Sequence, residues 1–159
     1  MSYTDTEWTF ACFAHSSNVF MLDICLYQYF LGRDGQTMAV DTLIRRQDDL
    51  YNNAVNVKNR FIELKSKLSD IHSSTALIPL MKLLGVYFKI VIICQPSKKE
   101  TRKSVHELVD FFRIIDYDMK KFYNYYKWKG LKYVKLYEQI GLSVYPIYNI
   151  YNKYFIFKK

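Results

Sequence analysis

The chain has 159 residues, half of them hydrophobic and 18% aromatic, and a formal net charge of +8. This composition excludes a largely disordered chain, and the length predicts one domain, residues 1–159, with enough material for a core. Five glycines and three prolines leave little turn chemistry for a many-stranded β fold, so we expect an all-α, single-domain helical bundle.

The first segment, about residues 5–31, is apolar and aromatic and predicts one or two helices broken near residues 16–18. The residues from Gly32 to Gly35 predict a turn. Cys12 and His15, with Cys25 nearby, lack a fourth ligand at a suitable spacing, so we expect no metal site and no cofactor. The odd number of cysteines and the lack of a signal-like N-terminus favour an intracellular setting.

A long amphipathic helix is predicted near residues 36–71. Nine of ten positions at alternating spacings of three and four are apolar, and Gln47 is the polar exception. This seam favours a bundle helix with a solvated outer face, and it is also compatible with pairing between protomers. The seam consists of Val40, Leu43, Gln47, Leu50, Ala54, Val57, Phe61, Leu64, Leu68 and Ile71.

After a predicted turn at His72–Thr75, residues 76–94 form an apolar run that is long enough to span a membrane. Lys82 and Lys89 lie within it, and an unpaired lysine near the bilayer centre costs about 3 kcal/mol. We therefore expect a buried central helix and no integral membrane span. The two lysines are seven residues apart, so they share one helix face, which we expect to be its exposed edge.

The C-terminal part begins with Pro96 and Ser97, and Glu100 follows three residues after the serine, which predicts a capping box. Apolar residues at helical spacing then predict a helix over residues 98–115. We expect Asp116 and Asp118 to flank the start of a short helix that ends at Gly130.

Another helix is predicted from Leu131 to Ile140, ending at Gly141. Pro146 breaks any helix in residues 142–159, where the β-branched and aromatic content also allows a strand.

Signatures of enzymes are nearly absent. The sequence has no dinucleotide-binding or P-loop glycine pattern, no zinc-protease motif and no nucleophile elbow. His106 has no identifiable nucleophile or orienting acid beside it. We therefore expect a protein without enzymatic activity.

The positive charge is unevenly distributed. Residues 1–95 carry nine basic and nine acidic side chains, whereas residues 96–159 carry 14 basic and six acidic ones, with ten of the 15 tyrosines. A neutral N-terminal half and a basic, aromatic-rich C-terminal half favour a polyanionic partner. The residues predicted to contact RNA are Lys98, Lys99, Arg102, Lys103, Lys120, Lys121, Lys127, Lys129, Lys132 and Lys135.

The run FKIVIICQPSKKETRKSVHELVDFFRI carries a family resemblance that covers residues 88–115, Phe88 to Ile115, and extends weakly through residues 120–145. It is similar to the middle of the RNA-silencing suppressors of closteroviruses, of the beet yellows virus type. The shared features are an apolar run before a proline-containing break, the triplet from Lys99 through Glu100 to Thr101, and the pattern from Leu108 to Phe112 with Arg113 after it. The resemblance implies an all-helical chain that assembles into a ring-shaped homo-oligomer and binds RNA, including small duplexes.

These observations predict a viral suppressor of RNA silencing in the host cytoplasm, which sequesters small double-stranded RNA without sequence preference. Two alternatives remain open. One is a helical host-interaction protein, such as a Bcl-2-like modulator that binds a partner helix. The other is a peripheral binder of anionic membranes.

Overall fold

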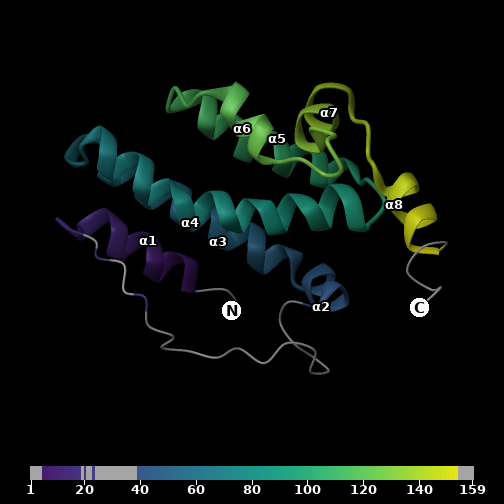
Figure 1. Ribbon diagram of the computed structural model, residues 1–159, viewed down its shortest axis with the longest axis horizontal. Coiled ribbons are helices and arrows are strands. Elements are labelled where there is room, and N and C mark those ends of the chain that lie inside the picture. Colours follow the sequence, from purple (N-terminus) through teal and green to yellow (C-terminus); the bar gives the residue numbers. More distant parts are fainter. Residues whose placement is uncertain (1–4, 19, 21–22, 24–38, 154–159) are drawn as a thin grey trace. The chain divides into compact units, whose positions relative to one another are not determined.

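The computed structural model describes residues 5–18, 20, 23 and 39–153, and its regular elements in these residues are helices (Figure 1). The predicted all-α fold is confirmed. The chain divides into two compact units, residues 1–83 and 84–159, here called the N-terminal and C-terminal units. The division falls within helix α4, Asp70–Phe88. The predicted turn at Gly32–Gly35 lies outside the described residues.

The N-terminal unit contains α1 (Asp5–His15), α2 (Val40–Arg45), α3 (Gln47–Leu64), the short 3₁₀ helix η1 (Lys65–Lys67) and the first part of α4. Helix α1 ends just before the predicted break at residues 16–18. It packs against α3, where the side-chain amide of Asn56 donates a hydrogen bond to Glu7 at 2.8 Å.

The seam of the predicted long helix is buried at Leu43 and from Leu50 to Phe61, and is exposed at its first and last positions, Val40 and Ile71. Leu50, Ala54, Val57 and Phe61 are at most 1% exposed, whereas Ile71 is 78% exposed. Because the middle positions are buried within a single chain, they already serve its own core.

One continuous helix over residues 36–71 was the wrong expectation. Residues 36–38 lie outside the described part, and the backbone leaves helical geometry at Arg46 and again at Leu68, which is extended (φ −98°, ψ 135°). The second break has a local cause, because the Ser69 hydroxyl accepts a hydrogen bond from the backbone N–H of His72 at 3.3 Å. A serine in this role starts a new helix.

Helix α4 continues directly into the π-helix η2, Lys89–Cys94. The turn predicted at His72–Thr75 is wrong, because these residues lie inside α4. Asp70–Cys94 is the one described stretch long and apolar enough to cross a membrane, but 72% of its apolar window is buried in the protein. Burial of this kind is typical of a core helix and gives no clear sign of a membrane span. Lys82 and Lys89 are exposed, as predicted.

The C-terminal unit continues with α5 (Lys99–Ile114), α6 (Met119–Tyr125), α7 (Tyr133–Ile140) and α8 (Tyr145–Tyr151) (Figure 1). Helix α5 matches its predicted range to within one residue at each end. Asp118 caps α6 by accepting from the backbone N–H groups of Lys120 and Lys121 at 2.9 and 3.2 Å. Gly141 ends α7 in the left-handed conformation (φ 70°), as expected of a helix-terminating glycine.

Two expectations about this unit are wrong. Helix α6 ends at Tyr125 rather than Gly130, because Trp128 and Leu131 pair across a tight turn in which Lys129 and Gly130 both have positive φ. Residues 145–151, whose conformation the sequence left open, are helical, against the expectation that Pro146 breaks any helix there. Pro146 lies in the first turn of α8, where its missing N–H costs no hydrogen bond.

Aromatic side chains form the centre of the C-terminal unit. Phe122 of α6 contacts Phe112 of α5, with ring centroids 4.7 Å apart, and it also contacts Phe88 and Tyr126. Phe88, Phe112 and Phe122 are fully buried, and Tyr126 is 2% exposed. This packing joins the last turn of α5 to α6, whose first turn carries the predicted RNA contacts Lys120 and Lys121.

Candidate nucleic-acid interface

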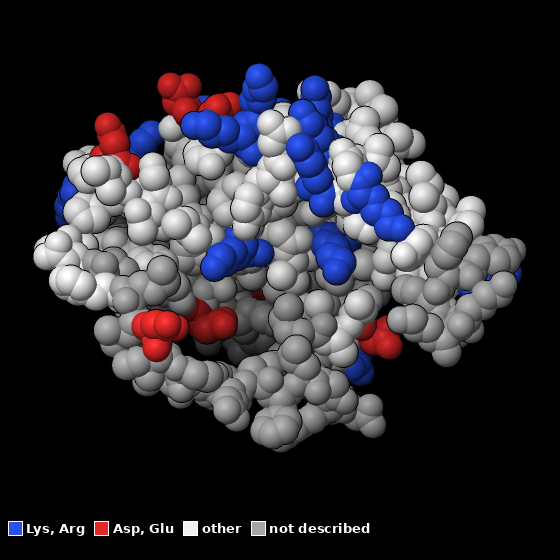
Figure 2. Space-filling model, in the orientation of Figure 1, with Lys and Arg blue, Asp and Glu red and all other residues white. Residues whose placement is uncertain are grey.

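All ten predicted RNA contacts belong to the C-terminal unit. Four lie at the start of α5, two in the first turn of α6, two around the Trp128–Leu131 turn and two at the start of α7. Nine of the ten side chains are exposed, and Lys132 is half-buried. Figure 2 shows basic side chains gathered over the region that α5, α6 and α7 occupy in Figure 1.

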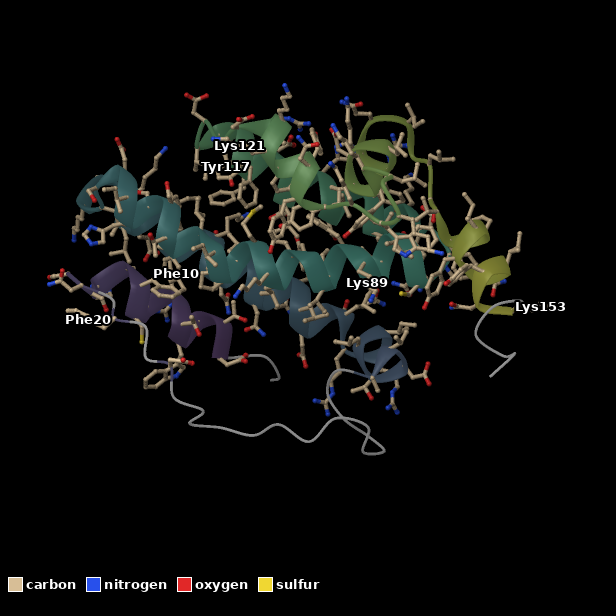
Figure 3. The ribbon with its side chains drawn as sticks, viewed as in Figure 1. Phe10, Phe20, Lys89, Tyr117, Lys121 and Lys153 are labelled. Atoms are coloured by element: carbon tan, nitrogen blue, oxygen red, sulfur yellow. The ribbon has the colours of Figure 1, made fainter. Side chains whose placement is uncertain are left out.

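The ten cations form a distributed surface rather than one pocket. The start of α5 lies against the end of α7, since Arg102 approaches Gly141. Lys132 and Lys135 lie at the other end of α7, about 12 Å along an eight-residue helix. Lys121 lies near Tyr117, beyond the far end of α5 (Figure 3).

Acidic partners are scarce on this surface. Among the described residues, Lys121 is the only one of the ten with an ion pair, to Asp118 at 4.0 Å. Lys129 instead lies over the ring of Tyr151, with Nζ 3.2 Å from the ring centre. A surface with this surplus of cations attracts polyanions.

The start of α5 lacks the predicted capping box. Lys98 is the N-cap residue, and no described side chain caps the first backbone N–H groups of the helix. The hydroxyl of Ser97 is hydrogen-bonded to the hydroxyl of Tyr137 at 2.8 Å instead. The expectation failed because Ser97 lies one residue before the cap position, where it joins α5 to α7.

Arg102 has a structural contact that sequence reasoning missed. A Cβ added at Gly141 would lie 3.0 Å from Nη1 of Arg102, so the guanidinium lies directly over the end of α7. A cation at this end of a helix complements the partial negative charge of its last carbonyl groups. Arg102 therefore contributes to the fold as well as to the basic surface.

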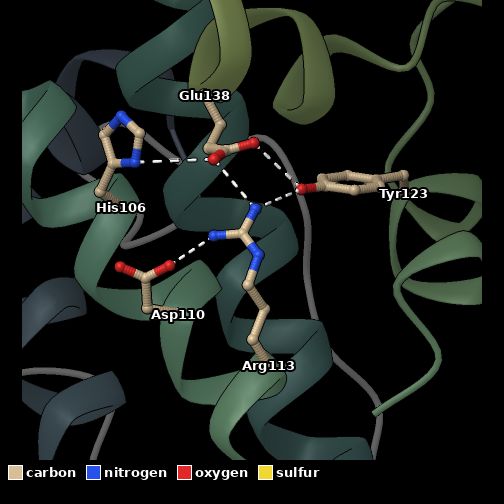
Figure 4. Close-up of polar contacts among 5 residues, drawn as sticks. All are labelled: His106, Asp110, Arg113, Tyr123 and Glu138. Carbon is tan, nitrogen blue, oxygen red and sulfur yellow. Dashed lines mark hydrogen bonds and ion pairs between the residues drawn. The ribbon is translucent and has the colours of Figure 1, made fainter. Parts of the chain in front are cut away.

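Arg113 belongs to a polar cluster that joins three helices (Figure 4). Its Nη2 donates to Glu138 Oε1 of α7 at 2.9 Å and to the hydroxyl of Tyr123 of α6 at 3.0 Å, and its Nη1 donates to Asp110. The Tyr123 hydroxyl donates to Glu138 Oε2 at 3.0 Å, and His106 Nδ1 lies 3.6 Å from Glu138 Oε1.

In this cluster the acidic partners of Arg113 outweigh the effect of burial on its charge. Burial acts to lower the pKa of Arg113, but the bonds to Glu138 and Asp110 outweigh burial and raise it. Burial also raises the pKa of Tyr123, and the neighbouring Glu138 carboxylate raises it further. The cluster holds a charged arginine, so Arg113 contributes to the framework that joins α5, α6 and α7.

The cluster has a signal in the sequence. Asp110 and Arg113 have the i, i+3 spacing of a helical ion pair, and Glu138 is the single acid after Asp118. A lone acid among many cations is a strong candidate for a structural ion pair. Within the described ranges, no group of three or more His, Cys, Asp and Glu side chains is arranged to hold a metal ion.

Comparisons with known proteins return no match: no family model, no curated protein and no solved structure matches the chain. The resemblance to closterovirus suppressors stays a prediction. The function of this chain is therefore inferred from its own residues.

Proposed function

We propose that the protein binds double-stranded RNA through the exposed basic surface of α5, α6 and α7, without sequence preference. The observation that supports this proposal is the surplus of charge: among the described residues, nine of the ten predicted contacts have no acidic partner. Phosphate contacts of this kind release counterions and bind any sequence.

The tyrosines favour recognition of the RNA backbone over recognition of bases. Tyr123, Tyr126, Tyr133 and Tyr137 are at most 7% exposed, so their rings cannot stack on bases, whereas Tyr125 is 55% exposed. Single-strand binders usually need several stacking platforms. A surface of lysines with few available rings suits a duplex, whose phosphates and 2′-hydroxyls are displayed outside.

In this proposal the protein is a viral suppressor of RNA silencing that acts in the host cytoplasm by withholding small RNA duplexes. Assembly into a ring, which the family resemblance implies, is part of the same proposal, and light scattering of the purified protein measures it. A partner helix bound in the manner of Bcl-2-like proteins would leave the basic surface unused.

The test is a titration of short duplex RNA by fluorescence anisotropy across salt concentrations. Replacing Lys98, Lys99 and Lys103 together by alanine should lower the slope of log affinity against log salt by about 0.7–0.9 for each lost contact. Arg102 is left in place because it contacts Gly141.

The matched control replaces Arg60, Lys65 and Lys67, three exposed cations of the N-terminal unit, by alanine. It changes the net charge equally and should leave the slope unchanged. A salt-insensitive affinity, or an equal loss in both triple variants, would overturn the proposal. A reporter-silencing assay with the same variants then tests the biological role.

A further inference from the structure

Helix α8 carries exposed apolar side chains that the proposed RNA surface does not use. Ile147 is 55% exposed and Ile150 59%, and their spacing of three places them on one face of the helix. Ile140 and Leu142, just before α8, are 67% and 50% exposed. Four exposed aliphatic side chains thus lie within eleven residues, at the end of the described chain.

The opposite side of α8 is anchored to the C-terminal unit. The helix packs against η2, and Tyr148 is hydrogen-bonded to the buried Cys94. Just before α8, the Ser143 hydroxyl donates to the carbonyl oxygen of Ile92 at 2.9 Å. The outward face is therefore held in a fixed orientation.

Cations lie around helix α8. Lys129 lies over Tyr151, Lys89 begins the η2 segment against which α8 packs, and Lys153 follows the end of α8 (Figure 3). All three lysines are exposed. The sequence contains no acid after Glu138. The surroundings of α8 are thus positively charged.

Aromatic residues complete the arrangement. Trp128 contacts Tyr148 edge-on, with ring centroids 6.2 Å apart, and Tyr151 and Tyr145 are half-exposed on the same helix. Tryptophan and tyrosine are the residues that favour the interface between lipid and water, because one end of each is apolar and the other polar.

We propose that the outward face of α8 binds peripherally to anionic lipid bilayers, as an activity separate from RNA binding. A bilayer offers an apolar layer for Ile147 and Ile150 and a negative surface for Lys129 and Lys153, whereas RNA offers no apolar layer. A second copy of the chain is disfavoured as the occupant of this face, because it would bring a second set of lysines against the first.

Flotation of the full chain with vesicles tests the proposal. The protein should float with vesicles that contain phosphatidylserine and remain unbound with pure phosphatidylcholine. Replacing Ile147 and Ile150 together by serine should weaken binding by about tenfold or more. Replacing Lys129 and Lys153 by alanine should weaken it by about fivefold per lysine.

The matched control replaces Ile62 of α3 and Ile114 of α5, two exposed isoleucines outside α8, by serine. Equal flotation of the two isoleucine variants, or equal binding to neutral vesicles, would overturn the proposal. So would a dimer that the Ile147 and Ile150 substitutions dissociate. The Lys98, Lys99 and Lys103 variant should float like the wild type, so failure of this proposal and failure of RNA binding are distinguishable.

Discussion

Both ends of helix α5 carry cations, but among the described residues these cations form ion pairs with acids only at the end of the helix. At its start, Lys98, Lys99 and Lys103 are exposed, without acidic partners among the described residues. At its end, Arg113 is bonded to Glu138 and Asp110. The same type of charge is therefore available to a ligand at one end and committed to the fold at the other. A count of lysines and arginines does not separate these roles, whereas the positions of the few acids do.

Replacing Arg113 by alanine should have the largest effect. The substitution leaves the Glu138 carboxylate, which is 7% exposed, without its cation. Breaking a buried ion pair costs about 3–5 kcal/mol, and we expect about 2–3 kcal/mol because the Arg113 side chain is 39% exposed. Urea unfolding measures the loss, and Lys99→Ala should change the free energy of unfolding by less than about 0.5 kcal/mol. Equal losses in the two variants would remove the distinction between the two ends.

Replacing Gly141 by alanine should cost about 1–2 kcal/mol of unfolding free energy, because of its left-handed backbone and the close contact with Arg102. In an Arg102→Ala background the cost should fall, since the contact is gone and the backbone strain alone remains. Gly85→Ala is the control, because an added Cβ there makes an ordinary 3.6 Å contact with Tyr126 and removes a glycine from a helix. The prediction fails if Gly141→Ala costs the same in both backgrounds.

Replacing Lys98 by aspartate should separate stability from binding. The backbone at position 98 is extended, as an N-cap requires, and an aspartate there can accept from the free N–H groups of α5. The variant should gain about 0.5–1 kcal/mol in thermal or urea unfolding and bind duplex RNA more weakly than the wild type. Lys98→Ala should lose affinity without the gain in stability. If aspartate gives no gain, the start of α5 is not the uncapped terminus described above.

Alkaline pH should produce the smallest effect. The pKa of Tyr123 is raised in the folded protein, so its contribution to stability is complete below the unfolded value of about 10 and is lost as the pH rises through the folded value. Burial raises the pKa values of Tyr126 and Tyr133 in the same direction. The free energy of unfolding should therefore fall above about pH 10. Tyr123→Phe should make the loss between pH 9 and 11 smaller, by less than about 1 kcal/mol. An unchanged loss would show that Tyr123 does not titrate with unfolding.

The sequence correctly predicted features that depend on local periodicity and, at Gly141, on a helix-ending glycine. The helical class, the range of α5 and the stop at Gly141 all follow from local patterns that the fold respects. The buried middle of the seam from Leu50 to Phe61 does as well. These features need little information from distant parts of the chain.

Prediction from the sequence failed where the local structure depends on a residue far away in the chain. Ser97 has the sequence of a cap, but Tyr137, forty residues later, takes its hydroxyl. The short length of α6 depends on the pairing of Trp128 with Leu131, and Arg113 and Glu138 meet only because α5 and α7 pack together. The ten basic residues were identified by type alone. Only the three-dimensional structure shows that nine of them have no acidic partner among the described residues.

The burial of the π-helix η2 limits the substitutions that this sequence can accumulate during evolution. From Ile90 to Cys94, five consecutive residues are at most 8% exposed, so the segment has no solvent-facing position. An ordinary surface helix tolerates polar replacements on its outer face, whereas here every position should reject them. A deletion scan should find the same, since the loss of a single residue would rotate all that follows. The segment from Ile90 to Cys94 should therefore vary least among descendants of this chain, while exposed lysines such as Lys89 remain free to change.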